Sequence, residues 1–552
     1  MSGIIINPYR FAATGLDPAA FVTEWTVGAG DTIKLYSYDA SPSGFTMDYD
    51  VDWGDSSSDS NVTTVDKTHT YSSAGTYQVV ITNQFGSLNM SRASVTEKGY
   101  LTNMVQWGTD NVWSSLYKMF ESCTLMEYTA TDSPNLTALV ENTQMRQTFY
   151  NCESAVNLDL SNWTNTSNIT YMYYAFGLMD SLRTLNLTGW DTSNVTYIGN
   201  MCYQSGDPVN GCDFTMPSLD MSSATTATNV FRGCFVKSMD ISGWTWRAAG
   251  ISLSSFLQDI DEGSSSGSFT INAANWLPAS GGSITNLASF LRNTEATSID
   301  LTGIDTSNVT TFSYAFYYNL NLTHITGLSS FDASSVTTID NMFRQAKVLN
   351  FGAGVTTNFG SDWGPNLGSC ANFTNTFLET GLTTPGSAVP YVTNWDVSGA
   401  TNMTSVFYNL KWTGGGNPDT SAWEIPGTVT TLANFIRGSS FTELDLSNAN
   451  VDFSGVTNFT SFAHNTTGLT RFILNGTLAK PGFTSVTLLN NAFYTVTLAT
   501  GDYDELLLKL DNGGQSTVTL NGGSSKYSAG AAATARASLV TKGWTITDGG
   551  PA

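Results

Sequence analysis

The feature that most constrains this chain is an internal repeat, marked by an aromatic residue that returns every 25 to 34 residues. A chain of 552 residues is too long for one hydrophobic core unless repetition extends that core. Short repeats that cannot bury their own apolar face stack on one another, which predicts a solenoid of about fourteen repeats. The marker positions are Phe120, Phe149, Phe176, Cys202 (in place of an aromatic), Phe231, Phe256, Phe290, Phe316, Phe343, Phe377, Phe407, Phe435, Phe462 and Phe493.

A second pattern predicts one short strand in each repeat. In Leu182-x-x-Leu185-x-Leu187-x-x-Trp190, the apolar residues at Leu185 and Leu187 alternate with polar ones. A period of two indicates a strand with one buried face, and parallel neighbours stack about 4.8 Å apart. Similar spacings recur at 155–163, 236–244, 296–304 and 441–449.

A polar segment follows the strand. Asp191-Thr192-Ser193-Asn194-Val195-Thr196 recurs with small changes at 165–170, 305–310 and 332–337. Asp, Ser, Thr and Asn can bond free backbone N–H groups, so the segment predicts a turn that leads into a helix N-cap. Val309 lies seven residues before Phe316, two helical turns away, so both should face the core. The predicted repeat is therefore strand, polar turn, short α- or 3₁₀-helix, and turn back.

Strand, turn and aromatic marker together resemble the BspA-like leucine-rich repeat family over residues of about 100–500. The resemblance implies a curved solenoid in a bacterial surface protein with a role in adhesion. Residues 201–289 and 350–404 depart from the pattern, with insertions such as Gly263-Ser264-Ser265-Ser266-Gly267. Any binding specificity is expected where the period breaks, around 203–288 and 350–404.

The two ends differ from the repeats. Residues 20–98 predict strands at 21–25, 32–36, 49–55 and 69–81, and the Trp53-Gly54-Asp55 turn resembles that of a PKD-like β-sandwich. The resemblance implies a spacer that caps the first repeat. Segments 503–510 and 529–542 predict helices, and 543–547 a strand, that cap the other end.

The predicted fold class is therefore β-rich α+β. The predicted domains are an N-terminal arm at 1–19, the sandwich at 20–98, the leucine-rich-repeat solenoid at 99–500 and a capping region at 501–552. The arm is expected either to tuck against the sandwich or to dock on a partner subunit.

The charge balance excludes some partners. The net charge is −23, from 45 acidic and 22 basic side chains, so we expect repulsion from nucleic acid and from anionic membranes. The alternative to simple solubility is a surface that binds cations. We expect no membrane insertion, because no apolar run approaches the ~18 residues of a span. We also expect no signal peptide, because the N-terminus lacks a basic region.

Asp50, Asp52 and Asp55, with Asp48 nearby, are the candidate metal ligands. Calcium prefers carboxylate oxygens, so these residues could hold Ca²⁺. The alternative is a turn whose carboxylates accept backbone N–H bonds. No other cofactor is expected, because His69, His324 and His464 lack zinc-binding spacing.

No catalytic motif is recognisable, so the chain is not expected to be an enzyme. There is no phosphate-binding loop and no G-x-S-x-G elbow. Paired carboxylates could hydrolyse glycosides. The aspartates, however, recur in repeat positions, which favours turn chemistry: Asp159, Asp191, Asp300, Asp305 and Asp445.

The cysteines are expected to be buried thiols, although stacked Cys123 and Cys152 could reach disulfide distance. The six are Cys123, Cys152, Cys202, Cys212, Cys234 and Cys370.

We expect a non-enzymatic structural and binding protein. The first hypothesis is a phage virion component (fibre, spike or capsid decoration) that contacts other virion proteins or a glycan or protein of the host surface. The second is a bacterial cell-surface adhesin, and a polysaccharide depolymerase is a distant third. Self-association into a homo-oligomer stays open. Tyr173-Tyr174 and Tyr317-Tyr318 could stack sugars or anchor a protein partner, with edge packing as the alternative.

Overall fold

The computed structural model describes residues 16–37, 46–139, 144–261, 270–274, 277–278, 284–327, 331–346, 364–382, 390–412, 416–476 and 482–552. Most of the predicted N-terminal arm, the Gly263–Gly267 insertion and residues 350–363 lie outside these ranges. The chain divides into two compact units, Met1–Ile251 with Asp259–Gly282, and Ser252–Gln258 with Ser283–Ala552.

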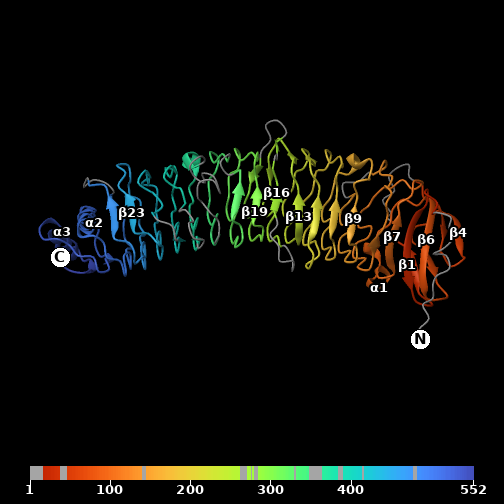
Figure 1. Ribbon diagram of the computed structural model, residues 1–552, viewed down its shortest axis with the longest axis horizontal. Coiled ribbons are helices and arrows are strands. Elements are labelled where there is room, and N and C mark those ends of the chain that lie inside the picture. The colour runs from red at the N-terminus through yellow and green to blue at the C-terminus, as the bar shows by residue number, and fades with distance from the viewer. Residues whose placement is uncertain are drawn as a thin grey trace. The chain divides into compact units, whose positions relative to one another are not determined.

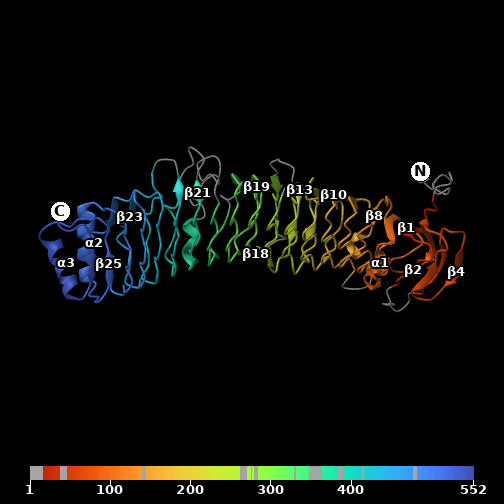
Figure 2. The same cartoon turned by 90° about the horizontal axis from the view of Figure 1, so that it is seen from below.

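The first unit begins with a two-sheet β-structure, in agreement with a sandwich at this end (Figures 1 and 2). One sheet has the strand order β4-β3-β6-β1-β7-β8, and β2 pairs with β5. The elements are β1 (Phe21–Val27), β2 (Thr32–Leu35), β3 (Asp48–Asp52), β4 (Ser58–Val62), β5 (Lys67–Thr70), β6 (Gly75–Gln84), a 3₁₀ turn η2 (Met90–Arg92), α1 (Val95–Lys98), β7 (Leu101–Gln106) and β8 (Glu127–Tyr128).

The same sheet joins this N-terminal structure to the first coils. β1 pairs antiparallel with both β6 and β7, and β7 pairs in parallel with β8. An exposed strand edge is a template for unwanted pairing. Within this unit, β1 covers the free edge of β7, which agrees with the predicted capping role.

The coils of the first unit stack in a parallel ladder. Leu158, Leu185, Phe214 and Met239 occupy matching positions of successive strands and are buried. Leu187 is buried as well, which confirms the alternation predicted at Leu185 and Leu187. The elements are β9 (Asn157–Asp159), η3 (Thr166–Asn168), β10 (Thr184–Asn186), β11 (Cys212–Thr215), β12 (Asp220–Met221), β13 (Val236–Asp240), β14 (Thr245–Trp246), β15 (Ile251–Ser252, at the boundary), β16 (Thr270–Asn272) and β17 (Leu277–Pro278).

The second unit continues the coils and ends in a helical cap (Figure 1). Its elements are β18 (Ile284–Asn286), β19 (Ser298–Asp300), β20 (His324–Thr326), η5 (Gly364–Ser369), β21 (Gly381–Leu382), β22 (Lys411–Trp412), β23 (Glu443–Leu446), β24 (Arg471–Leu474), α2 (Thr500–Asn512), β25 (Thr519–Asn521), α3 (Ala531–Thr541) and β26 (Thr545–Thr547). The two helices and β26 confirm the predicted secondary structure of this end. Within the described ranges, no helix is long and apolar enough to cross a bilayer.

The aromatic marker lies on a turn segment, so the predicted short helix at this point is wrong. Two residues with positive φ lie four apart and flank a central residue, as Tyr314 (φ 58°) and Tyr318 (φ 62°) flank Phe316. A left-handed residue interrupts a right-handed helical path, and here two of them lie about one helical turn apart. The central residues of the coils are Phe120, Phe149, Phe176, Cys202, Phe231, Leu257, Leu291, Phe316, Phe343, Phe377, Phe407, Ile436, Ala463 and Phe493.

Hydrogen bonds between coils explain why this conformation replaces a helix. The N–H groups of Tyr314, Phe316 and Tyr318 donate to carbonyls of the next coil, at 3.0, 2.9 and 2.9 Å. The intervening N–H of Tyr317 closes a turn on the carbonyl of Tyr314. In this segment each coil therefore donates in one direction, toward the following coil. Neighbouring repeats use the backbone donors that a helix would have kept within itself.

The central position is not always the marker aromatic, which corrects the predicted register. The N–H of Phe407, a central residue, donates to the carbonyl of Phe435, whereas the central residue of that next coil is Ile436. Both positions are fully buried in that coil. A large ring can therefore fill the core from the central position or from the position before it. The side chain at the other position is then smaller, so the total volume is kept. The markers shifted by one residue are Phe256, Phe290, Phe435 and Phe462.

The angle between neighbouring phenylalanine rings depends on whether both occupy the same position in their coils. Phe377 and Phe407, both central, stack with an interplanar angle of 3°, whereas Phe407 and Phe435 lie at 80°. Phe435 and Phe462, both shifted, stack again at 10°. From Phe377 to Phe462, the core of the second unit is thus a column of rings with two entry positions.

Exchanging the two side chains tests this arrangement. We expect the double variant Phe435→Ile/Ile436→Phe to lose less than about 1.5 kcal/mol of unfolding free energy, because total volume is kept. Phe435→Ala should lose about 3–5 kcal/mol, because it leaves a cavity. Urea denaturation measures both, and an equally severe loss in the double variant would show that the two positions are not interchangeable.

Asp207 is expected to make the stability of the first unit sensitive to acid. Burial acts to raise the pKa of Asp207, but hydrogen bonds from Asn210 and Arg183 and from two backbone N–H groups outweigh it and lower that pKa to about 2. A depressed pKa contributes stability that is present above the unfolded value and is lost as pH falls from about 4 to 2.

We therefore expect Asp207→Asn to lower the free energy of unfolding by roughly 2 kcal/mol at pH 7 and to flatten its decline between pH 4 and 2. Urea denaturation across pH provides the measurement. Asp213→Asn, which removes a surface ion pair with Lys237, is the matched control and should cost under about 1 kcal/mol. An unchanged acid profile in Asp207→Asn would contradict the assignment.

Candidate functional site

The candidate calcium ligands lie on and just after β3, and each carboxylate already accepts hydrogen bonds from the protein. Asp50 accepts the Asn61 N–H at 2.7 Å, and Asp52 accepts the Gly54 N–H at 2.9 Å. Asp55 accepts the Ser57 N–H at 3.0 Å. Among the described residues, no group of three or more acidic, histidine or cysteine side chains is placed to hold a metal ion. The calcium site stays a prediction, and the alternative role in turns has direct hydrogen-bond support.

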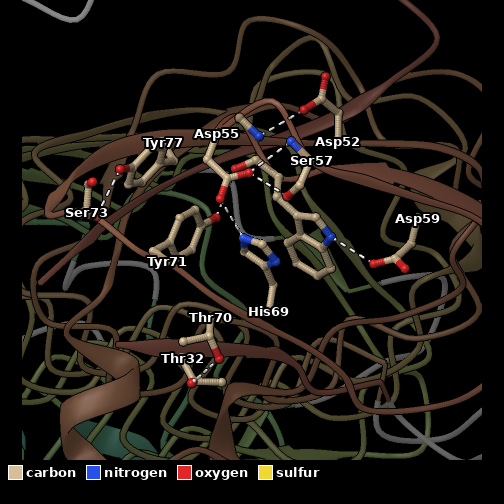
Figure 3. A network of polar contacts seen from close by, with 12 residues as sticks. Thr32, Asp52, Asp55, Ser57, Asp59, His69, Thr70, Tyr71, Ser73 and Tyr77 are labelled. Atoms are coloured by element: carbon tan, nitrogen blue, oxygen red, sulfur yellow. Dashed lines mark hydrogen bonds and ion pairs between the residues drawn. The ribbon is translucent and has the colours of Figure 1, made fainter. Parts of the chain in front are cut away.

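Asp55 instead pairs with the predicted strand residue His69. Figure 3 shows the Asp55 carboxylate directed at the His69 ring, whose Nε2 lies 2.8 Å from Oδ2. The His69 ring stacks on Trp53 with centroids 4.8 Å apart. Burial acts to raise the pKa of Asp55, but the hydrogen bonds from Ser57 and His69 outweigh it, and this pKa is lowered. The cluster fastens the Trp53-Gly54-Asp55 turn to β5.

The repeated aspartates perform turn chemistry, as their spacing indicates. Asp191 accepts the N–H of Ser193 at 3.1 Å, and Asp305 accepts the N–H of Ser307 at 2.9 Å. The same bond to the residue two positions later is made by Asp159, Asp300 and Asp445. A side chain that bonds its own backbone two residues on closes an Asx turn. These bonds confirm the turn role predicted for all five residues. They do not start a helix, so the N-cap role predicted for the segments that begin at Asp191 and Asp305 is wrong.

All six cysteines are buried free thiols, which confirms the thiol prediction. The Sγ of Cys234 donates to the carbonyl of Cys202 at 2.8 Å, and that of Cys152 to Phe120 at 3.1 Å. Burial raises the pKa of Cys234 and of Cys370 to about 12. Thiols held neutral in this way are poor nucleophiles.

A row of aromatic and basic side chains follows the turn segment of the second unit. Each member comes directly after a central residue, so each coil contributes one side chain. The first of these residues, Gln258, has neither a ring nor a charge, and we call the others the aromatic–cationic row: Arg292, Tyr317, Arg344, Leu378, Tyr408, Arg437, His464 and Tyr494. Apart from Tyr494, which is 46% exposed, the arginine, tyrosine and histidine members are half-buried.

Contacts along the row alternate between cations and rings. The Arg292 guanidinium lies 5.3 Å from the Tyr317 ring centroid, and that of Arg344 lies 5.5 Å from the same ring. Because Tyr317 belongs to the coil between these two arginines, it is held from both neighbouring coils. Arg437 lies 5.5 Å from the Tyr408 ring. Such cation–π contacts contribute about 0.5–1 kcal/mol each at exposed sites.

His464 extends the row without adding charge. Its ring meets Tyr494 edge-on, with centroids 5.0 Å apart. Burial and, secondarily, the nearby Arg437 charge lower the pKa of His464. Its imidazole is therefore neutral near pH 7, and the arginines carry the positive charge of the row.

The first unit holds a denser tyrosine cluster with one cation. Tyr173 meets Tyr174 edge-on at 4.5 Å, and Tyr171 stacks on Tyr197 at 4.8 Å. The Arg146 guanidinium lies 5.5 Å from the Tyr173 ring. The predicted platforms Tyr173-Tyr174 and Tyr317-Tyr318 thus belong to half-buried clusters, with Tyr318 itself 39% exposed.

The sequence patterns did not reveal the arginines of the row. Arg344 follows the marker Phe343 by one residue, whereas Arg292 follows Phe290 by two. Arg292 and Arg344 occupy equivalent positions in their coils, but they lie at different distances from the marker phenylalanine. Their equivalence is therefore not visible when the phenylalanines are used as the reference. Polar residues that commonly precede and follow the central residue by two positions, such as Asn341 and Gln345, were the available signal.

A comparison with known protein families finds a match that covers most of the coils. A family model described as "Mycoplasma protein of unknown function, DUF285" matches residues 114–244, 266–361 and 371–504. The chain belongs to the DUF285 family. All members of the aromatic–cationic row fall within the DUF285 matches, whereas β1–β7 lie before them. No curated protein and no solved structure matches the chain.

Proposed function

We propose that this DUF285 protein is a non-enzymatic structural and binding protein, a phage virion component that contacts the host surface through its solenoid. The aromatic–cationic row carries the binding part of the proposal. Hydrogen bonds between coils hold the row in register, with a ring or a cation from every coil except that of Leu378, and a repeated row can engage a ligand at several points at once. Tyr and Arg are also the side chains enriched at binding hot spots.

The finer assignments belong to the same proposal. The coils are BspA-like leucine-rich repeats, and the N-terminal sheets form a PKD-like sandwich that caps them. The support is the buried strand alternation, the recurring Asx turns and the pairing of β1 with β7.

Mass spectrometry and antibody labelling of purified virions test the location. We expect the intact chain in particles that infect the host, and antibodies against the solenoid should reduce adsorption. Its absence from virions made by a host that expresses the gene would overturn the location. Release of reducing ends from host polysaccharide would overturn the non-enzymatic assignment.

A bacterial cell-surface adhesin is the second candidate, because the family description names a bacterium, Mycoplasma. Protease treatment of intact cells distinguishes the two. Loss of the chain from the cell surface without lysis would favour the adhesin, and protection until lysis would favour the virion component.

A further inference from the structure

Among the described residues, the arginines of the row form no ion pair, whereas other arginines of this protein have acidic partners. Arg183, Arg471 and Arg536 each form an ion pair at 2.7 Å. Within the described residues, neither Arg292 nor Arg344 has a carboxylate within ion-pair distance, although the chain carries 45 acidic side chains. In the part of the chain that the structure describes, no ion pair therefore neutralises these two charges, although the net charge of the protein is −23.

The geometry of these guanidinium groups leaves donors available. The Nε atoms of Arg292 and Arg344 are buried, so a ligand must be met by the terminal Nη groups. One of these, Nη1 of Arg344, also donates to Asn341 Oδ1 at 3.4 Å. The acids of neighbouring coils are engaged elsewhere: Asp340 accepts from Ser313 and Thr338, and Glu379 accepts from Gln345. A guanidinium that lies over a ring still presents N–H groups at its edge, where it can bind a carboxylate with two parallel bonds.

The tyrosines of the row provide aromatic faces beside the arginines. Tyr317, Tyr408 and Tyr494 occupy the same position as the arginines in other coils and are half-buried or exposed. The apolar C–H face of a sugar ring packs well on an aromatic ring. Parallel coils repeat about every 4.8 Å, which is close to the length of one sugar residue in an extended polysaccharide.

We propose that the aromatic–cationic row binds an acidic polysaccharide, a chain with carboxylates on successive sugar rings that lies along the coils. Carboxylates pair with Arg292, Arg344 and Arg437, and sugar rings pack on the intervening tyrosines. The inference rests on the proposed binding function of the solenoid, and not on its location in a virion. Nucleic acid fits less well, because its charges lie about 1.7 Å apart and the net charge of the protein would repel so dense a polyanion.

Binding of the full-length protein to three polyuronates, polygalacturonate, alginate and polyglucuronate, tests the proposal by biolayer interferometry. We expect binding to at least one, and none to the same polymer after its carboxylates are methyl-esterified. Arg292→Gln/Arg344→Gln should weaken binding at least ~10-fold, and so should Tyr317→Leu. Arg183→Gln removes the same charge outside the row and should change affinity less than ~2-fold.

Each other outcome overturns the proposal. These outcomes are no binding to any of the three polymers, equal binding to the methyl ester, or a loss in Arg183→Gln as large as in the row variants. Equal binding to polyglutamate or to single-stranded DNA would assign the row to an acidic peptide or to nucleic acid. A urea midpoint unchanged from wild type shows that the row variants are folded. If the protein is present in virions but does not bind polyuronates, this inference is wrong and the proposed function is unaffected.

Discussion

Phe377→Ala should lower the free energy of unfolding by about 3–5 kcal/mol, because it leaves a cavity in the ring column of the second unit. Phe377 is fully buried between Phe343 and Phe407, with ring centroids 5.8 and 5.7 Å away and nearly parallel planes. Deleting its ring removes contacts on both faces at once.

The cavity should stay open, which is why we expect a cost at the upper end of the usual range. The Phe343 N–H donates to Thr376, and the Phe377 N–H donates to Val406, both at 2.9 Å. These backbone bonds fix the spacing of the three coils, so neighbouring rings cannot move in to fill the space.

Urea denaturation followed by tryptophan fluorescence measures the loss. Tyr391→Ala is the control, because Tyr391 is 42% exposed and its truncation should cost less than about 0.5 kcal/mol. A loss below about 1 kcal/mol in Phe377→Ala would mean that the ring column does not support the fold.

Gly523→Ala should cost more than about 3 kcal/mol and should open the C-terminal cap. Gly523 has φ +65°, and a Cβ there would overlap the carbonyl oxygens of Val496 and Phe493. The N–H of the next residue, Ser524, donates to the Val496 carbonyl at 2.9 Å. Relieving the overlap would therefore break the contact between the cap and the last coil.

Gly514→Ala is the matched control for this prediction. Gly514 also has positive φ (+76°), but a Cβ there would meet no atom within 4 Å. It should cost only the conformational strain, about 1 kcal/mol. Hydrogen exchange of residues 482–552 measures both variants, and equal protection in the two would show that the close approach at Gly523 is unimportant.

The repeat and much of its local chemistry were predictable from the amino-acid sequence. The alternation at Leu185 and Leu187 requires one buried strand face, because side chains of a strand point to opposite sides. Asp191 and Asp305 were attributable to turns, since short carboxylates bond backbone N–H groups two residues on. The helices at the C-terminal end were also predictable from apolar periodicity, because they form within short segments.

The conformation of the marker segment and the composition of the row depend on contacts between coils, which the sequence patterns do not contain. A spacing of seven between Val309 and Phe316 suits both two helical turns and a chain of tight turns. The choice depends on hydrogen bonds to the next coil, which no single repeat contains. The same bonds reveal that Phe435 and Ile436 share one core volume. Arg437 therefore aligns with Tyr408 and Arg344, an alignment set by stacking between coils and invisible in any one of them.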